Sequence, residues 1–387
     1  MRQLTKNLIA LAAGAVLAQG SSLASAVTHY RVTILGSPAA GRSIDDYGNV
    51  AGYVKQANGT LHATLWRFGR QIDLGTLGND PTLSSMVLWP VKNYIGLVSG
   101  ISLTDQPDPN QEGWSCGAFL NNPNHNACVG FVWDPFTRQM HALPTLGGAN
   151  GFATGTNDFG QTVGWAENTL KDPTCIAPQV LQFKPVVWGP RHDRIRALPL
   201  LAGDGSGAAT AINDRGQIVG ISGDCGIAVG SVTAKHAVIW DGGTVTQIVT
   251  PFGDQAPYWN TPMMINQRGD VVGFYGVPND PGANFSLAFF WNREDGFQKL
   301  PLLAGDISST ASSINNRRQI VGYSNDTNGT NHPWIWQNGV VRNLNDLIEP
   351  GSALTGPIEL AFDINDEGVI TGRSTTRQAI VAVPVDD

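Results

Sequence analysis

The chain has 387 residues, of which 14% are charged, and its formal net charge at pH 7 is -7. An acidic chain lacks the basic surface that nucleic-acid binding requires, and a hydrophobic fraction of 42% is too high for a disordered chain. The 46 Gly and 23 Pro residues are scattered through apolar runs, which favours many short strands and turns over long helices.

The first segment in chain order predicts export. Arg2 and Lys6 precede an apolar run at residues 8–18, and Ala24, Ser25 and Ala26 follow as a small-residue cleavage site. This order is typical of a secretory signal peptide. We therefore expect cleavage after residue 26 and a mature protein, residues 27–387, that is extracellular or periplasmic. The apolar run is shorter than the ~20 residues that span a membrane, and we expect no transmembrane span elsewhere.

From residue 44 onward, one short unit recurs along the chain. Its clearest copy, at residues 211–220, reads Ala-Ile-Asn-Asp-Arg-Gly-Gln-Ile-Val-Gly: an apolar strand ending in Asn, a turn, and a second apolar strand ending in Gly. Asn, Asp and Gly suit tight turns with positive φ, so each copy predicts a β-hairpin. The copies lie at residues 44–52, 91–100 (degenerate), 156–164, 211–220, 265–273, 314–322 and 364–372.

A third strand ending in Trp and a fourth strand follow the hairpin in each complete unit. Four-stranded units of about fifty residues, repeated in this way, are typical of a β-propeller. The last unit lacks its fourth strand, and residues 30–36 have the matching pattern. We therefore predict one all-β domain, a seven-bladed β-propeller whose last blade is closed by the N-terminal strand, in preference to an open stack or a β-helix. The strand-ending residues are Trp66, Trp133, Trp188, Trp240, Trp291 and Trp336.

The pattern Ile-Asn-Asp-x-Gly-Gln-Ile-Val-Gly, with His-Ala-Val-Ile-Trp at residues 236–240 and Leu-Gly-Thr-Leu-Gly at 74–78, resembles the bacterial extracellular HAF-repeat family. The resemblance covers essentially the whole mature chain. The His-Ala-Phe signature itself is loose, since residues 62–64 read His-Ala-Thr. The resemblance implies an exported repeat protein and supplies no catalytic residues.

The repeat also gives structural roles to residues that would otherwise suggest chemistry. His62, His236 and His332 occupy one equivalent position in separate units, whereas the ligands of a metal must converge. We expect these histidines to cap strands through hydrogen bonds, the strand-ending Trp residues to pack within blades, and the Asn-Asp pairs to be turn residues. The remaining histidines, which no spacing brings together, are His29, His125, His141 and His192.

The loops between second and third strands vary in length, whereas the hairpin turns at the other end of each blade are short and uniform. Length variation on one face marks the expected working face. All four Cys residues lie in these loops. An even number in an exported chain indicates two disulfides with three conceivable connectivities. The placement of the residues predicts Cys116–Cys128 within one loop and Cys175–Cys225 between neighbouring loops.

The longest of these loops contains two patterns with chemical meaning. Residues 113–117 read Gly-Trp-Ser-Cys-Gly, which marks a hydrolase nucleophile only between a strand and a helix. We expect no helix here and interpret the match as chance. Asp108, Asn110 and Glu112 resemble the first half of a calcium loop, although Phe119 stands where the twelfth, acidic ligand would be. Bound Ca²⁺ is therefore one hypothesis and a solvated loop the other, and we expect no other cofactor.

Four aromatic residues stand outside the series of strand-ending Trp residues: Trp89, Trp114, Tyr258 and Trp259. Exposed aromatic rings on a rigid face suit stacking against sugars. The alternative is that these rings plug the propeller or pack under its loops.

Together these features predict a monomeric, secreted binding protein that holds a glycan, a peptide or a cell-surface ligand on its loops. A secreted hydrolase or lyase acting on a polymer from the same face is the first alternative, because propellers host many activities. It would need a cluster of His, Tyr or carboxylate side chains near the ring opening. A structural envelope or matrix protein is the second alternative.

Overall fold

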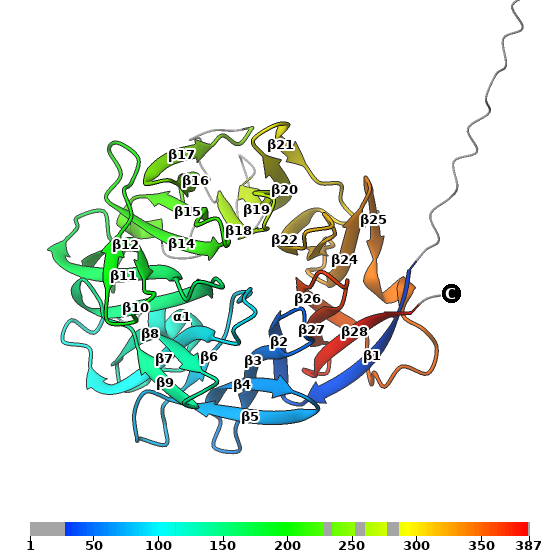
Figure 1. Cartoon of the computed structure of the whole chain (residues 1–387), viewed down its shortest axis with the longest axis horizontal. Helices are drawn as coiled ribbons and strands as arrows, with labels where there is room; N and C mark the ends of the chain where they lie inside the picture. The colour runs from blue at the N-terminus through cyan, green and yellow to red at the C-terminus, as the bar shows by residue number, and fades with distance from the viewer. Residues whose placement is uncertain (1–27, 113, 228–233, 252–259, 277–285, 386–387) are drawn as a thin grey trace, which may run out of the picture.

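A computed structural model describes residues 28–112, 114–227, 234–251, 260–276 and 286–385. The strands form seven antiparallel four-stranded sheets arranged around a ring (Figure 1). The first strand of each sheet lies nearest the centre and the fourth lies at the rim (Figure 1). The predicted seven-bladed β-propeller is therefore confirmed.

The blades follow one another along the chain, and we number them from the first hairpin. Blade 1 contains β2 (Ala39–Ile44), β3 (Val50–Lys55), β4 (Leu61–Arg67) and β5 (Arg70–Gly75). Blade 2 contains β6 (Ser85–Met86), β7 (Val98–Pro107), β8 (Asn126–Asp134) and β9 (Gln139–Ala142). Blade 3 contains β10 (Gly147–Thr156), β11 (Thr162–Lys171), β12 (Leu181–Trp188) and β13 (Ile195–Ala197).

The other four blades have the same order. Blade 4 contains β14 (Ser206–Ile212), β15 (Ile218–Gly223), β16 (His236–Asp241) and β17 (Thr244–Ile248). Blade 5 contains β18 (Thr261–Ile265), β19 (Val271–Gly276), β20 (Ser286–Asn292) and β21 (Gly296–Lys299). Blade 6 contains β22 (Ser308–Ile314), β23 (Ile320–Asn325), β24 (Asn331–Gln337) and β25 (Val340–Asn343). Blade 7 contains β26 (Ile358–Ile364), β27 (Ile370–Ser374), β28 (Ala379–Val385) and β1 (His29–Gly36).

The ring is closed by the N-terminal strand, as the sequence predicts. Strand β1 pairs antiparallel with β28, in a register that places His29 opposite Val385 and Gly36 opposite Ala379. The two ends of the described chain therefore meet in one sheet (Figure 1). This pairing gives blade 7 its fourth strand and leaves β28 without an open edge.

The hairpin turns are built as their sequence indicates. In blade 4, the Asn213 side-chain oxygen accepts hydrogen bonds from the backbone N–H groups of Arg215 (3.1 Å) and Gln217 (3.0 Å), and Gly216 takes a φ of 73°. The closing Gly220 is needed for another reason. A Cβ atom there would collide with the carbonyl oxygen of Ala208 on the paired strand, so only glycine fits.

The equivalent histidines form hydrogen bonds, as expected. His236 Nδ1 lies 2.8 Å from an Asp204 carboxylate oxygen, and His332 Nδ1 lies 2.7 Å from one of Asp306. These aspartates end the two identical Leu-Pro-Leu-Leu-Ala-Gly-Asp segments, at residues 198–204 and 300–306. Each copy of the duplicated segment therefore supplies the aspartate that pairs with the histidine of the same blade.

The strand-ending Trp residues pack within and between the blades, as predicted. Two of them also donate hydrogen bonds to the preceding connection: Trp188 Nε1 to the Pro144 carbonyl (2.8 Å) and Trp240 Nε1 to the Pro199 carbonyl (2.6 Å). Trp66, Trp133, Trp188 and Trp240 are buried, and Trp291 and Trp336 are partly buried against the core.

The expectation of a helix-free loop in blade 2 is wrong. A short helix, α1 (Trp114–Phe119), lies between β7 and β8 (Figure 1). Six residues are too few to produce a helical periodicity in the sequence, and no acidic residue marks the first turn. The helix contains one half of a disulfide, Cys116, and its side chain is fully buried. Tertiary contacts therefore stabilise a segment whose own helical preference is weak.

Candidate functional site

Cavities open on both faces of the ring. We call the face with the loops between second and third strands the loop face, and the opposite face, with the hairpin turns, the turn face. The turn-face pocket has a volume of about 510 Å³ and is lined by Asp45, Asp46, Lys92, Asn93, Tyr94, Ile212, Asp214, Met264, Ile265, Asn266, Gln267, Ile314, Asn315, Asn316 and Asp366. The loop-face pocket has a volume of about 1060 Å³ and is lined by Pro38, Ala39, Tyr53, Lys55, Gly59, Leu61, Asn121, Glu359, Arg373, Thr375 and Arg377.

On the turn face, polar side chains link each hairpin to the next. The Asn315 amide donates to the Asn365 carbonyl oxygen of the following blade (2.8 Å), and its oxygen accepts from two backbone N–H groups of its own turn. The residue after each turn Asn also accepts a hydrogen bond from the equivalent backbone N–H of the preceding blade. These second contacts, donor first, join Asp158 to Asp214 (2.8 Å), Asp214 to Gln267 (3.0 Å), Gln267 to Asn316 (2.9 Å), Asn316 to Asp366 (2.7 Å) and Asp366 to Asp46 (2.8 Å).

Within the described ranges, one charged pair crosses between non-adjacent blades. Lys92 Nζ of blade 2 lies 2.7 Å from Asp363 Oδ1 of blade 7 and donates to the Ile364 carbonyl oxygen at 2.6 Å. Asp363 is fully buried and also accepts hydrogen bonds from the Ile44 backbone N–H and the Ser313 hydroxyl. The polar groups around the turn-face pocket therefore hold the ring together, in keeping with the structural role predicted for the turn residues.

The loop-face pocket lies where blade 7 meets blade 1. Its walls come from the end of β3, the residues after β27, and the start of β26, and the long blade 2 loop contributes Asn121. The Ala39 backbone N–H donates to the Arg377 carbonyl oxygen at 2.8 Å, which fixes the two blades together at this edge. The pocket is therefore on the face that the sequence marks as the working face.

A bulged arginine lies beside this pocket. The register of β2 with β3 shifts between Gly41 and Ser43, so Arg42 is the extra residue of a β-bulge. Its guanidinium carbon lies 3.8 Å from the ring centre of Phe362, the equivalent bulge residue of blade 7, and 5.7 Å from that of Tyr53. Arg42 is half-buried, and its Nε atom is buried without a hydrogen-bond partner among the described residues.

Burial and neighbouring charges shift the pKa values of Arg42 and Tyr53. Burial lowers the pKa of Arg42, with a smaller opposing effect from Tyr53. Burial alone would raise the pKa of the Tyr53 phenol, but the charge and hydrogen bonds of Arg42 and Arg373 lower it below its ordinary value. The phenol is therefore a more acidic hydrogen-bond donor than an ordinary tyrosine.

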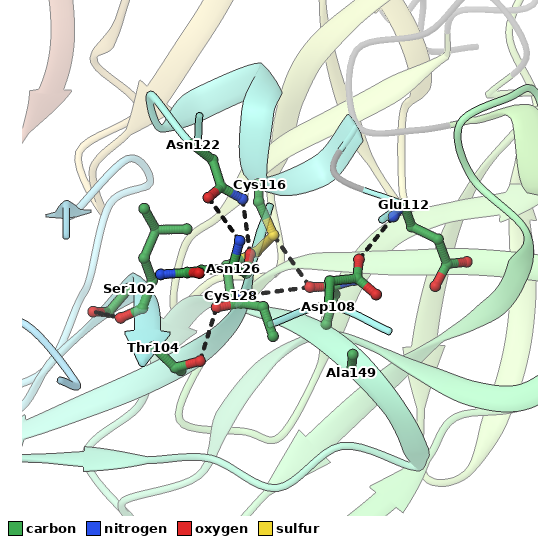
Figure 2. Close-up of a disulfide and its surroundings, with 12 residues drawn as sticks. Ser102, Thr104, Asp108, Glu112, Cys116, Asn122, Asn126, Cys128 and Ala149 are labelled. Atoms are coloured by element: carbon green, nitrogen blue, oxygen red, sulfur yellow. Dashed lines mark hydrogen bonds between the residues drawn. A yellow bond between two sulfur atoms is a disulfide. The ribbon is translucent and has the colours of Figure 1, made fainter. Parts of the chain in front are cut away.

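The disulfides are those that the loop placement predicts. Cys116 pairs with Cys128 across a Cα–Cα distance of 5.7 Å, and Cys175 pairs with Cys225 at 4.4 Å. Figure 2 shows the first of them between α1 and β8. The second joins the loops of blades 3 and 4. Two disulfides are consistent with an extracellular or periplasmic protein.

The acidic residues proposed as calcium ligands point inward rather than to solvent. Asp108 Oδ2 accepts hydrogen bonds from the Glu112 backbone N–H (2.8 Å) and the Asn150 amide (3.0 Å), as Figure 2 shows in part. Glu112 Oε1 accepts from the Val180 N–H (2.9 Å) and the Leu181 N–H, and its Oε2 accepts from the Asn110 amide (3.1 Å). The described residues contain no group of three His, Cys, Asp or Glu residues arranged to hold a metal. The Ca²⁺ hypothesis stays a prediction.

A carboxylate that the sequence did not single out belongs to the same network. Glu167 is fully buried and accepts hydrogen bonds from the Asn150 backbone N–H (2.9 Å) and the Gln179 amide (2.9 Å). Burial raises the pKa of Glu167 to about 7, and nearby Glu112 adds to the shift, while the amide donors oppose it. The network therefore joins the long blade 2 loop to blade 3 through buried carboxylates.

The four aromatic candidates do not form one described surface. Trp89 is buried, with its ring centre 6.1 Å from that of Phe119 and 5.4 Å from that of Phe152, so it packs under the loop, the second role considered for it. The Trp114 side chain, Tyr258 and Trp259 lie outside the described residues. Their part in ligand binding stays a prediction.

Two of the non-repeat histidines lie side by side. The rings of His141 and His192 stack with their centres 6.3 Å apart, next to the fourth strands of blades 2 and 3. Burial and the neighbouring His141 lower the pKa of His192. This pair is at the rim and lines neither of the pockets described above.

Repeat alignment contains a signal for the loop-face cluster that the sequence analysis did not use. The bulge position holds Thr154, Thr210 and Ser312 in other blades but Arg42 in blade 1. The position after the closing glycine is uncharged in blades 1 to 6 but holds Arg373 in blade 7. The uncharged residues are Tyr53, Ile101, Trp165, Ile221, Phe274 and Tyr323. Charged residues at positions that are otherwise uncharged indicate a local role beyond the fold.

Comparison with known proteins supports the fold. No protein-family model and no curated protein matches the sequence. Among solved structures, virginiamycin B lyase from Staphylococcus aureus is 9% identical, with a TM-score of 0.50 over 92% of this chain and 100% of that one. An oligogalacturonate lyase in complex with manganese is 9% identical, with a TM-score of 0.49 over 93% and 96%. The Aleuria aurantia lectin is 9% identical, with a TM-score of 0.38 over 85% and 98%. At these identities the likeness is to the propeller fold alone.

Proposed function

We propose that this chain is an exported HAF-repeat propeller that binds a glycan or another cell-surface component in the loop-face pocket. The observation that carries the proposal is the pocket itself: a cavity of about 1060 Å³ on the variable face, lined by Tyr53, Lys55, Arg373 and Arg377. The signal-peptide pattern at residues 1–26, which lies outside the described residues, and the two disulfides support export to an oxidising compartment.

The loop face is favoured over the turn face because of what the polar groups do on each. The turn-face groups are engaged in hydrogen bonds between blades, so the fold accounts for them. On the loop face, Lys55 and Arg377 are exposed and form no ion pair within the described part of the chain. Polar groups that the fold does not use are available to a ligand.

A polymer-acting lyase or hydrolase is a second candidate for the same pocket. Tyr53 and Glu359 both line it, and they belong to the residue types that such an enzyme would need near the ring. A phenol with a lowered pKa is suited to proton transfer. Product analysis of any bound polysaccharide separates this candidate from simple binding.

The proposal is tested by presenting the mature protein to an array of bacterial and plant glycans. We expect one glycan class to bind, and we expect the double substitution Lys55→Ala/Arg377→Ala to reduce that binding at least tenfold. The matched control is Arg196→Ala, which removes an exposed cation from β13 in blade 3. An array without any ligand, or equal losses in the control and the pocket variant, would contradict the proposed site.

A further inference from the structure

Arg42 is a cation for which the fold supplies no anion. Its guanidinium packs on Phe362 and near Tyr53, and its Nε atom is buried without a partner. Among the described residues, no Asp or Glu forms a salt bridge with it, whereas other cations that cross between blades, such as Lys92 and Arg318, are paired with Asp363 and Asp270. A charge that is partly withdrawn from water without a counter-ion lowers the stability of a protein. A small or apolar residue would suit the fold better at this bulge, as in the other blades.

The surroundings of Arg42 are also cationic. Glu359 is the acidic residue among those lining the loop-face pocket, and its carboxylate is already engaged. Its Oε2 accepts from Arg373 Nε (3.2 Å) and Nη2 (2.9 Å), and its Oε1 accepts from the Asn331 amide (3.3 Å). Lys55 and Arg377 add two further positive charges. The pocket is thus positive in a chain whose net charge is -7, so bulk composition does not explain it.

The geometry favours a carboxylate on a hydroxylated ligand. A guanidinium presents a planar fork of donors that matches a carboxylate, and the Tyr53 phenol next to it adds another donor. The cavity is far larger than an inorganic ion, so its size suits an organic ligand. The Asn121 amide and the Thr375 hydroxyl in its wall can exchange hydrogen bonds with sugar hydroxyls.

From these observations we infer that the loop-face pocket binds an acidic sugar. Lys55 in the pocket wall, and Arg42 beside the lining residue Tyr53, hold its carboxylate, and Tyr53 donates a hydrogen bond to it. This inference rests on the proposed function and specifies its ligand class. In the complex, the carboxylate of the ligand supplies the negative charge that Arg42 lacks in the fold.

The test compares three probes by calorimetric titration of the mature protein: a trimer of galacturonic acid, a neutral trimer of galactose, and inorganic sulfate at matched ionic strength. We expect the acidic trimer to bind at least tenfold more tightly than either other probe, and we expect added salt to weaken it. Equal binding of the acidic and neutral trimers would overturn the acidic-sugar assignment. Sulfate that binds as tightly as the acidic trimer would show that the pocket recognises anions in general, and would also overturn the acidic-sugar assignment.

Variants locate the site and separate ligand binding from folding. Arg42→Met is expected to lower affinity for the acidic trimer at least tenfold while leaving the Tm unchanged or higher, because it removes a half-buried charge that has no counter-ion. A lower Tm with intact binding would show that Arg42 is structural and overturn the inference. Lys55 is exposed, so Lys55→Glu should not disturb folding and serves as a second test in case Arg42→Met misfolds. It should abolish binding of the acidic trimer, whereas Arg196→Glu in blade 3 should not.

The failures of the two proposals are distinguishable. A neutral glycan that binds and is lost in the Lys55→Ala/Arg377→Ala variant would preserve the proposed function and overturn only the acidic-sugar inference. An acidic trimer that binds equally well to all of these variants would place the site elsewhere and overturn both.

Discussion

Individual side chains of this propeller differ in whether their charge is compensated. Glu167 is a buried carboxylate surrounded by amide donors, with Asp108 and Glu112 in the same network. The Gln179 side-chain oxygen is buried without a donor. Burial and the nearby Glu112 favour the neutral acid more strongly than the amide donors favour the carboxylate, so the pKa of Glu167 is raised.

This gives a pH dependence with a definite sign. Because the pKa of Glu167 is about 7 in the folded protein and 4.5 ordinarily, the folded state binds the extra proton between these values. Stability from this group is complete below about pH 4.5 and is lost as the pH rises through about 7. The shift corresponds to about 3 kcal/mol. Denaturant titrations at pH 5 and pH 8 should show Glu167→Gln gaining stability relative to wild type at pH 8, and a constant difference would contradict this account.

At the scale of the element, each hairpin turn reverses the chain and can also form hydrogen bonds to the next blade. Asn315 is buried, closes its own turn through its side-chain oxygen, and reaches the next blade through its amide. In blade 1 the equivalent residue is Asp45, which accepts from the Tyr47 and Asn49 backbone N–H groups but has no amide to donate. The turn can therefore form without the contact to the next blade.

Substitutions of Asn315 can separate its contacts within the turn from its contact to the next blade. Asn315→Ala should lower the free energy of unfolding by about 2 to 3 kcal/mol, because buried backbone groups on both sides lose their partners. Asn315→Asp should lower it by less, because it keeps the two acceptor contacts of the turn. Urea denaturation of both variants measures this. A smaller loss for the alanine variant than for the aspartate variant would show that the contacts described here do not stabilise the ring.

At the scale of the whole molecule, the ring depends on contacts between segments distant in the chain. Lys92 crosses from blade 2 to the buried Asp363 of blade 7, and β1 completes the sheet of β28. Lys92→Met should destabilise the protein by about 3 to 5 kcal/mol, because it leaves a buried carboxylate without its counter-ion. In calorimetric melts, Asp363→Asn added to Lys92→Met should restore part of the loss. An unchanged Tm for Lys92→Met would exclude this pair as a major tie.

The fold was predictable from the sequence because each unit repeats the same pattern of turn residues and apolar strands. Asn and Gly mark the turns, Trp ends the third strand, and the missing last strand points to residues 30–36. The disulfides followed from the placement of cysteines in equivalent loops. By contrast, α1 has no periodic signal, and the pocket brings Tyr53 of blade 1, with Arg42 beside it, together with Arg373 of blade 7 at the far end of the sequence. Only ring closure places blade 7 beside blade 1, so the site becomes visible only with the tertiary structure.

The pairing of β1 with β28 also means that the ring can close only after the last strand has been synthesised. His29 lies near the start of the described chain, whereas its partner Val385 lies at its end and is synthesised much later. At 5 to 20 residues per second, roughly 20 to 70 s separate them. During that time β1 is an unpaired strand that can associate with other chains, and the loop-face pocket, whose walls come from blades 7 and 1, does not yet exist. Synthesis of the last strand therefore closes the ring, covers the exposed strand edge and completes the pocket together.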